Sequence, residues 1–330
     1  MRSIMVTEFG EPEVLEVQEV LQPQPQPHEV LLRVVSTSVN FADIKARQGR
    51  YHGTSHPPFI PGLDAAGIVV ALGSEVQGIR VGTPVLAFTN NGSYAEYATA
   101  SSSLVFPLPE GVNWDMAAAL PVVAFTAYKL LHDVGRIVPG ERILIHAAAG
   151  GVGTTAIQLA RLLGASEIYG TVSHDGKKSA AVKVGADLVI NYTQEDFVKE
   201  IQERTNGRGV DLILDAVGGP IAERSMEILA PFGRMVHFGS ASGQGANISL
   251  GDLHASCRSV LGFSLGTTRV TRPESLESTA KAVLHYVSAG QLTIQIGRKY
   301  LLEEAAAAHR WIESRSSTGK TLLEVGPKPS

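Results

Sequence analysis

The stretch RILIHAAAGGVGTTAIQLARLLG, residues 142–164, decides the fold. Its first five residues, 142–146, form an apolar run that is typical of a buried strand, and residues 154–163 have the pattern of a helix. Between them, residues 148–153 read AAGGVG, which is the G-x-G-x-x-G arrangement with Ala148 in the place of the first glycine. This order of strand, small-residue turn and helix is typical of a dinucleotide-binding loop.

Small residues are needed in this turn for physical reasons. Gly150 has no Cβ and lets the backbone approach a pyrophosphate, while Gly153 lets the helix pack closely on the strand. The free N–H groups and the positive end of the helix dipole then face the phosphates. The alternative is a merely tight connection between strand and helix. We expect the loop to supply cofactor contacts from Ala149, Gly150, Gly151, Val152 and Gly153.

The sequence on either side of this turn extends the same pattern. Strand-like runs alternate with helical segments, which predicts a parallel sheet covered by helices on both faces. The predicted strands are residues 142–146, 167–172, 188–190, 210–216 and 234–238. Residues 114–131 form a long Ala- and Leu-rich helical stretch that we expect Pro121 to interrupt. The first third of the chain contains short strand candidates separated by turns, as in a compact β-rich domain.

The residues that follow the second predicted strand bear on the choice of nicotinamide cofactor. An NAD-binding chain usually has a carboxylate about 20 residues after the glycine motif, where it holds the ribose 2′-hydroxyl. Here Ser173 lies 20 residues after Gly153, and Lys177 and Lys178 follow. A hydroxyl and ammonium groups suit a 2′-phosphate, so the sequence favours NADP(H) over NAD(H). The alternative is that these lysines belong to a solvated surface.

Composition excludes several classes of protein. The 330 residues carry a formal net charge of −4 and are 44% hydrophobic, which is enough for a packed core and unlike a disordered chain. The mildly acidic balance does not favour a nucleic-acid binder. One cysteine excludes an internal disulfide and a four-cysteine zinc site. The acidic N-terminus does not have the pattern of a signal peptide, and no apolar run reaches about 18 residues, so we expect a cytoplasmic protein.

Several motifs resemble those of one family. Residues 140–161 carry Gly140-Glu141, Leu144, the AAGG turn, Gln158 and Arg161 in the order of that family's nucleotide-loop signature. The segments 40–51, 61–67, 92–97 and 314–320 match further landmarks. The chain therefore resembles the zinc-independent quinone oxidoreductases of the medium-chain dehydrogenase/reductase superfamily, a group that includes zeta-crystallin. The dipeptide Thr83-Pro84 departs from the family, in which a Gly-Asp-Arg turn is usual.

The resemblance implies an α/β architecture with a GroES-like β-rich catalytic domain and a Rossmann domain with a doubly wound parallel sheet. The catalytic domain would comprise residues 1–122 and 265–330, and the NADP(H)-binding domain residues 123–264. The resemblance also implies a homodimer that forms through sheet edges of the nucleotide domains. Residues 259–265 are our candidate edge strand, because pairing would cover its backbone groups.

Zinc-dependent relatives of this family have a cysteine and a histidine where this chain has Asn40 and Leu63. A catalytic zinc would lack those ligands, so no metal is expected. Direct hydride transfer to a quinone or to an α,β-unsaturated carbonyl compound then fits better than alcohol oxidation. We expect Tyr51 and Asn40 to donate hydrogen bonds to the developing oxyanion. Asp43 is a third candidate catalytic residue, with a role at a helix N-terminus as the alternative.

Further cofactor contacts are expected at positions implied by the resemblance and by the architecture. Thr126 corresponds to a position near the nicotinamide ribose in the family, and Tyr192 to one on the adenosine side. Phe238, Gly239 and Ser240 end a strand where ligands of open parallel sheets bind. The remaining candidates for cofactor binding are Ser264, Leu265 and Lys320.

The leading hypothesis is thus an NADPH-dependent reductase of a small quinone or enone, without a nucleic-acid or membrane partner. Two alternatives remain at this stage. One is an enoyl-thioester reductase that acts on a carrier-bound substrate. The other is an NADPH-binding protein of low turnover with a structural or RNA-binding role.

Overall fold

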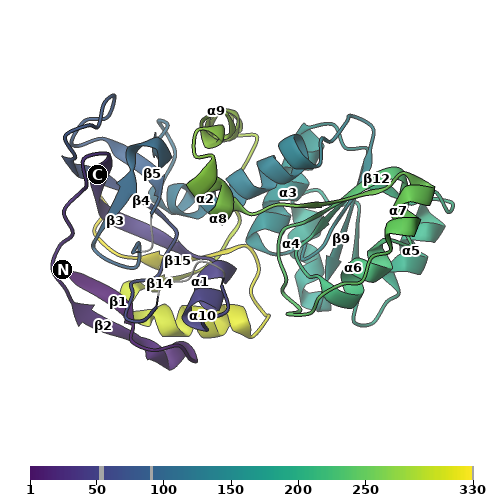
Figure 1. Cartoon of the computed structure of the whole chain (residues 1–330), viewed down its shortest axis with the longest axis horizontal. Coiled ribbons are helices and arrows are strands. Elements are labelled where there is room, and N and C mark those ends of the chain that lie inside the picture. Colours follow the sequence, from purple (N-terminus) through teal and green to yellow (C-terminus); the bar gives the residue numbers. More distant parts are fainter. Residues whose placement is uncertain (52–55, 90–91, 329–330) are drawn as a thin grey trace. The chain divides into compact units, whose positions relative to one another are not determined.

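The computed structural model describes residues 1–51, 56–89 and 92–328. The chain forms two compact units, which are coloured by sequence in Figure 1. Unit 1 comprises Met1–Phe125 and Thr268–Ser330, and unit 2 comprises Thr126–Thr267. The domain boundaries predicted at residues 122 and 264 lie three residues from these limits.

Unit 2 is built on a parallel sheet of six strands in the order β10-β9-β8-β11-β12-β13. In order of appearance along the chain this is 3-2-1-4-5-6, the order of a Rossmann fold, so the predicted fold class is confirmed. The order reverses between β8 and β11, where ligands of such sheets bind. The strands are β8 (Arg142–Ile145), β9 (Glu167–Val172), β10 (Leu188–Asn191), β11 (Val210–Asp215), β12 (Leu229–His237) and β13 (Ser259–Gly262).

Helices pack against this sheet and enclose an apolar core. Leu144, Tyr169 and Ile213 from the strands are fully buried there with Phe197. One strand differs from the prediction: β12 begins at Leu229, five residues before the expected start, because Leu229 pairs with Val210 ahead of an irregularity in the register. The helices of the unit are α3 (Gly151–Leu162), α4 (Lys178–Lys183), α5 (Phe197–Arg204), α6 (Gly219–Ser225) and α7 (Leu250–Ser256).

Unit 1 is built on a seven-stranded sheet in the order β14-β15-β3-β4-β5-β7, with β6 paired to β3, beside a two-stranded sheet of β1 and β2. Its core is apolar, with Ile4, Val34, Tyr94 and Leu323 buried together. The strands are β1 (Arg2–Val6), β2 (Leu15–Glu19), β3 (Glu29–Val39), β4 (Asp64–Leu72), β5 (Pro84–Phe88), β6 (Tyr97–Ser101), β7 (Val105–Pro107), β14 (Ile296–Leu301) and β15 (Lys320–Glu324). The helices α1 (Phe41–Arg47), α9 (Ser275–Ser288) and α10 (Ala305–Glu313) belong to this unit, and α8 (Leu265–Thr271) crosses its boundary.

The helix α2 (Trp114–Tyr128) corrects one expectation, because it continues through Pro121. Proline removes one helical hydrogen bond and crowds the preceding turn. Here the next N–H, that of Val122, is satisfied by the carboxylate of Asp64 at 3.1 Å. The helix continues into a π-helical turn, Lys129–Val134. The segment Trp114–Val134 is long and apolar enough to span a membrane, but 72% of its most apolar window is buried within the protein, as in a core helix.

Candidate functional site

The glycine-bearing turn of unit 2 lies directly after β8, at the carboxyl edge of the sheet. Helix hydrogen bonding begins with the N–H of Thr154, which donates to Gly150 O at 2.9 Å. The N–H groups of the residues before it therefore have no partner inside α3. A Cβ on Gly153 would lie 2.4 Å from Ala147 O, so only glycine fits at this position. This turn provides what a diphosphate needs: a helix N-terminus whose first donors are not used by the helix itself.

The other predicted cofactor residues of unit 2 also follow its strands. Because the strands are parallel, their carboxyl ends meet at one edge of the sheet. The structure brings to this edge Ala149, Gly150, Gly151, Val152 and Gly153 after β8, Ser173 after β9, Tyr192 after β10, Phe238, Gly239 and Ser240 after β12, and Ser264 and Leu265 after β13. Thr126 lies apart in sequence from these connections, as the buried first residue of unit 2 in α2.

The ends of β9 and β10 form the part of this edge that we expect to bind the adenosine. The N–H of Tyr192 donates to Val172 O at 3.1 Å, and the hydroxyl of Thr193 reaches Ser173 O. Lys178 is already bound to Glu195 at 2.6 Å and to Asp175 at 3.1 Å. Of the two lysines considered for a 2′-phosphate, Lys178 thus has its charge neutralised within the protein, and the contact from Lys177 stays a prediction.

A carboxylate–imidazole pair that no local sequence motif indicates lies at the same edge. Asp215 ends β11 and is fully buried, and its Oδ2 lies 2.7 Å from Nδ1 of His237 at the end of β12. The other carboxylate oxygen accepts the N–H groups of Val217 and Gly218. Burial opposes ionisation of Asp215, but these hydrogen bonds outweigh it and hold its pKa below the usual value. The sequence feature that could have indicated this pair is Asp215, a polar residue at the end of a largely apolar strand.

A buried histidine lies just before the glycine turn in the chain. His146 follows β8 directly, with Nδ1 at 2.7 Å from the hydroxyl of Thr171 and Nε2 at 2.8 Å from that of Ser225. Burial lowers the pKa of His146 to about 4. The neutral imidazole therefore ties β8 to β9 and α6.

In unit 1, the predicted catalytic residue Asn40 belongs to a buried polar cluster. Its side-chain Nδ2 donates to Asp64 Oδ1 at 3.0 Å and to Ser38 O at 3.3 Å, while its Oδ1 accepts from Lys320 Nζ at 2.7 Å. The second oxygen of Asp64 holds Val122 N. Both amide hydrogens of Asn40 therefore have acceptors inside the protein.

Lys320 lies in β15 and is buried, and it also donates to Val39 O at 3.1 Å. Burial lowers the pKa of its ammonium, against the attraction of Asp64 and Asp43. Its expected contact with a cofactor stays a prediction, since its ammonium donates to Asn40 and Val39 within unit 1.

Asp43 is the third member of the predicted catalytic set, and it is almost fully buried. Its Oδ2 accepts the N–H of Asn40 at 2.8 Å and the hydroxyl of Tyr94 at 3.3 Å, so it also serves the first turn of α1. Burial raises the pKa of Asp43 to about 7, although the Asn40 hydrogen bond acts in the opposite direction. Tyr94 in turn contacts His309, whose pKa burial lowers to about 3.

Tyr51, the remaining predicted catalytic residue, follows α1 and is half-buried. Burial raises the pKa of its phenol. The guanidinium of Arg269 in α8 acts against that rise, so the two groups lie within electrostatic range of each other. Arg269 was not singled out from the sequence, because 218 positions separate it from Tyr51.

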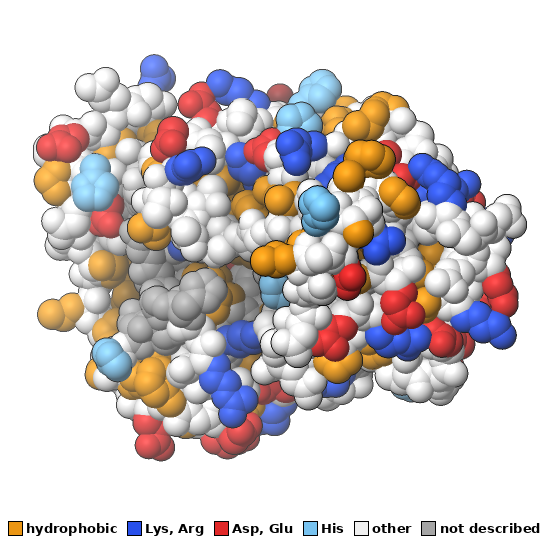
Figure 2. Space-filling model, turned by 45° about the vertical axis from the view of Figure 1, so that its right-hand side comes forward, with side chains coloured by type: hydrophobic (Ala, Val, Ile, Leu, Met, Phe, Trp, Pro, Cys, Tyr) orange, Lys and Arg blue, Asp and Glu red, His pale blue; other side chains and the backbone are white. Residues whose placement is uncertain are grey.

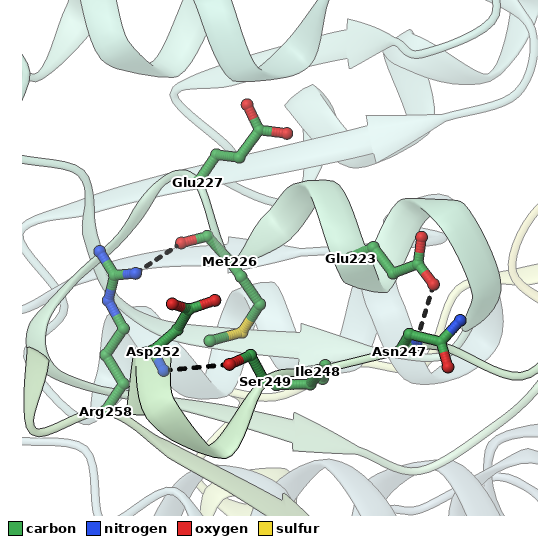
Figure 3. A pocket seen from close by; sticks show the side chains of 8 residues that line it. All are labelled: Glu223, Met226, Glu227, Asn247, Ile248, Ser249, Asp252 and Arg258. Carbon is green, nitrogen blue, oxygen red and sulfur yellow. Dashed lines mark hydrogen bonds between the residues drawn. The ribbon is translucent and has the colours of Figure 1, made fainter. Parts of the chain in front are cut away.

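Within the described ranges, no group of three or more histidine, cysteine, aspartate or glutamate side chains could hold a metal ion. A surface cavity of about 290 Å³ lies in unit 2, and none of the predicted site residues lines it. Figure 3 shows three hydrogen bonds at this cavity, from Arg258 to Met226 O, from Asn247 N to Glu223 and from Asp252 N to Ser249.

Comparison with known proteins gives two family matches. Residues 26–110 match the model of the alcohol dehydrogenase GroES-like domain, and residues 151–281 match that of a zinc-binding dehydrogenase. A quinone oxidoreductase of Pseudomonas aeruginosa is 35% identical over 98% of this chain and 99% of its own length. The chain belongs to the quinone oxidoreductase family. This confirms the resemblance to the zinc-independent members of the medium-chain dehydrogenase/reductase superfamily.

Two further matches bear on function in this family. The crystal structure of Escherichia coli quinone oxidoreductase complexed with NADPH has a TM-score of 0.91 and 34% identity, and the match covers 98% of this chain and all of that one. A phenolphthiocerol/phthiocerol polyketide synthase of Mycobacterium tuberculosis is 34% identical over 98% of this chain. The matched region is only 15% of that much longer protein.

Proposed function

We propose that this family member is an NADPH-dependent oxidoreductase that transfers hydride to a quinone or an α,β-unsaturated carbonyl compound without a metal. The observation that carries the proposal is the carboxyl edge of the unit 2 sheet, where the glycine turn, Ser173 and Tyr192 follow neighbouring strands. The E. coli relative, whose structure contains NADPH, supports the choice of cofactor.

Bound NADPH would supply the hydride, and this chain's own residues would bind and position the reactants. The N-terminus of α3 would hold the diphosphate, with Ser173 and Lys177 at the 2′-phosphate. Tyr51 keeps its proton at neutral pH, because burial raises its pKa, and so it would donate to the acceptor oxygen. The Asn40 amide would need to release Asp64 or Ser38 to donate as well.

The test measures loss of NADPH absorbance with 1,4-benzoquinone, 9,10-phenanthrenequinone and a crotonyl thioester in parallel. Turnover of the two quinones, with weaker turnover of NADH, is the expected result. Tight binding of NADPH without turnover of any acceptor would contradict a reductase and favour the structural or RNA-binding alternative.

The polyketide synthase relative favours one second candidate, an enoyl-thioester reductase. This activity uses the same cofactor edge but a carrier-bound acceptor. A kcat/KM for the crotonyl thioester that exceeds the values for both quinones would select it.

The partner that we propose is a small molecule. On the face drawn in Figure 2, acidic and basic side chains are interspersed, whereas nucleic-acid binding favours a basic patch. A cytoplasmic location and a homodimer are part of the same proposal. The strand β13 supports the dimer, because it lies at the end of the strand order beside β12 and its side chains are partly exposed.

A further inference from the structure

Arg269 is a largely buried cation of unit 1 that the proposed mechanism does not use. Its Nη1 donates to Leu63 O at 3.3 Å and its Nη2 to Thr89 O at 3.1 Å. The guanidinium also lies over the ring of Phe88, 5.3 Å from its centroid. These contacts fix the guanidinium between the residue that precedes β4 and the residue that follows β5.

The charge of Arg269 is not neutralised by these contacts. Carbonyl oxygens accept hydrogen bonds but carry no formal charge, and Arg269 forms no ion pair within the described part of the chain. Among the residues that the structure describes, two of the five N–H groups of this guanidinium are used, and the buried Nε has no partner. Burial accordingly lowers the pKa of Arg269. A buried cation with unused donors is costly unless an anion or an electron-rich oxygen joins it.

Tyr51 lies in the electrostatic neighbourhood of this cation, together with Asp43. Among the described residues, neither carboxylate forms an ion pair with Arg269: Asp64 accepts from Ser38, Asn40 and Val122, and Oδ2 of Asp43 accepts from Asn40 and Tyr94. Unit 1 thus holds a phenol and a guanidinium with unused N–H groups within electrostatic range of each other. This combination suits an oxygen that gains negative charge during a reaction.

We propose that Arg269 is a catalytic residue whose guanidinium receives the acceptor oxygen on which negative charge develops, beside the hydroxyl of Tyr51. The inference rests on the function proposed above. In this step the hydride leaves NADPH with its electron pair and bonds to the acceptor, and NADP⁺ remains. The conjugated π electrons of the acceptor shift to its carbonyl oxygen, and a proton from water then neutralises that oxygen.

The experiment uses 4-nitrophenol, whose phenolate carries the same type of charge as the developing oxyanion. Its absorbance is titrated with pH in the NADP⁺-bound enzyme, for wild type, Arg269→Gln and the matched control Arg298→Gln. Arg298 is an exposed arginine of unit 1 that lies over Tyr300 and Trp311. We expect the pKa of bound 4-nitrophenol to lie about one unit below that of the free ligand in wild type and in the control, and to return towards the free value in Arg269→Gln.

A second readout is kcat/KM for 1,4-benzoquinone, which we expect to fall about 100-fold in Arg269→Gln with the Kd of NADPH unchanged. A merely structural role, holding Leu63 and Thr89, would lower Tm but leave the pKa of bound 4-nitrophenol as in wild type, and that result overturns the proposal. If the pKa of 4-nitrophenol bound to wild type lies at or above that of the free ligand, the proposal is overturned whether or not the variant folds. Failure of the phenolate to bind to wild type also overturns it. The proposed function fails separately, if wild type reduces no acceptor.

Discussion

At the scale of single residues, the side-chain amide of Asn40 is oriented by three partners, of which two, Asp64 and Lys320, come from distant parts of the chain. Lys320 fixes its oxygen, and Asp64 and Ser38 take its hydrogens. An asparagine with a satisfied amide is a rigid support rather than a free donor. We therefore expect the Asn40 side chain to act mainly as a support, while the backbone N–H of the same residue binds Asp43 Oδ2 at the start of α1.

Lys320→Met tests this support. The substitution removes the Lys320 donor from Asn40 Oδ1 and from Val39 O, and a buried acceptor that is left unsatisfied costs roughly 1–3 kcal/mol. We expect the free energy of unfolding to fall by about 3 kcal/mol in urea denaturation. The control is Lys281→Met, which removes an exposed ion pair with Glu277 and should cost less than about 1 kcal/mol. Equal losses in the two variants would contradict the prediction.

The buried carboxyl of Asp43 makes stability depend on pH. Its pKa is about 7 in the folded protein, above the ordinary value of 3.8, so the folded state binds this proton more tightly than the unfolded state does. Its contribution is fully present below about pH 4 and is lost as pH rises through 7. Wild type should therefore lose Tm relative to Asp43→Asn between pH 5 and pH 8, by differential scanning calorimetry. Parallel Tm profiles for the two proteins would exclude this role of Asp43.

Individual site residues were predictable where a local motif carries them. The Asn40–Asp43 spacing and the residues of the glycine turn are short-range patterns. Arg269 and the Asp215–His237 pair depend on contacts between residues that no local pattern connects. The partners of Lys320 were missed for the same reason, because β15 meets β3 only through the sheet.

At the scale of elements, the close packing of α3 against the turn that follows β8 requires a residue without a side chain at position 153. A Cβ on Gly153 would lie 2.4 Å from Ala147 O and 2.7 Å from two backbone atoms of Ala148, which cannot move as a flexible side chain would. Gly153→Ala should lower Tm and weaken NADPH binding at least tenfold, measured by fluorescence titration. Gly245→Ala is the matched control, because no atom of the described residues lies within 4 Å of its Cβ. Normal NADPH affinity in Gly153→Ala would refute the role of this contact.

The strands of unit 2 were predictable because each is a short apolar run between helical segments. The early start of β12 was not, since its first residues pair only through an irregular register with β11. The continuation of α2 through Pro121 was equally hidden, because it depends on Asp64 in another element. Elements with a hydrophobic pattern of their own could be predicted from the sequence, whereas features that depend on contacts with residues distant in the chain could not.

At the scale of the whole molecule, we expect two chains to associate through the β13 edge. With a chain mass of 35.0 kDa, the dimer has twice that mass, about 70 kDa, by light scattering. Val260→Pro should favour the monomer, because proline removes a backbone donor from the strand. A wild-type protein that scatters as a single chain would refute the dimer.

The passage of the chain from unit 1 to unit 2 falls inside α2, between Phe125 and Thr126, rather than in a loop. Cleaving the gene at that point would leave each fragment with half a helix and a fresh set of unsatisfied N–H or C=O groups. A nucleotide-binding fragment intended for separate expression should therefore retain the whole helix from Trp114. The apolar residues of α2 that belong to unit 1 would then be exposed in that fragment. Shuffling of this module between genes faces the same constraint.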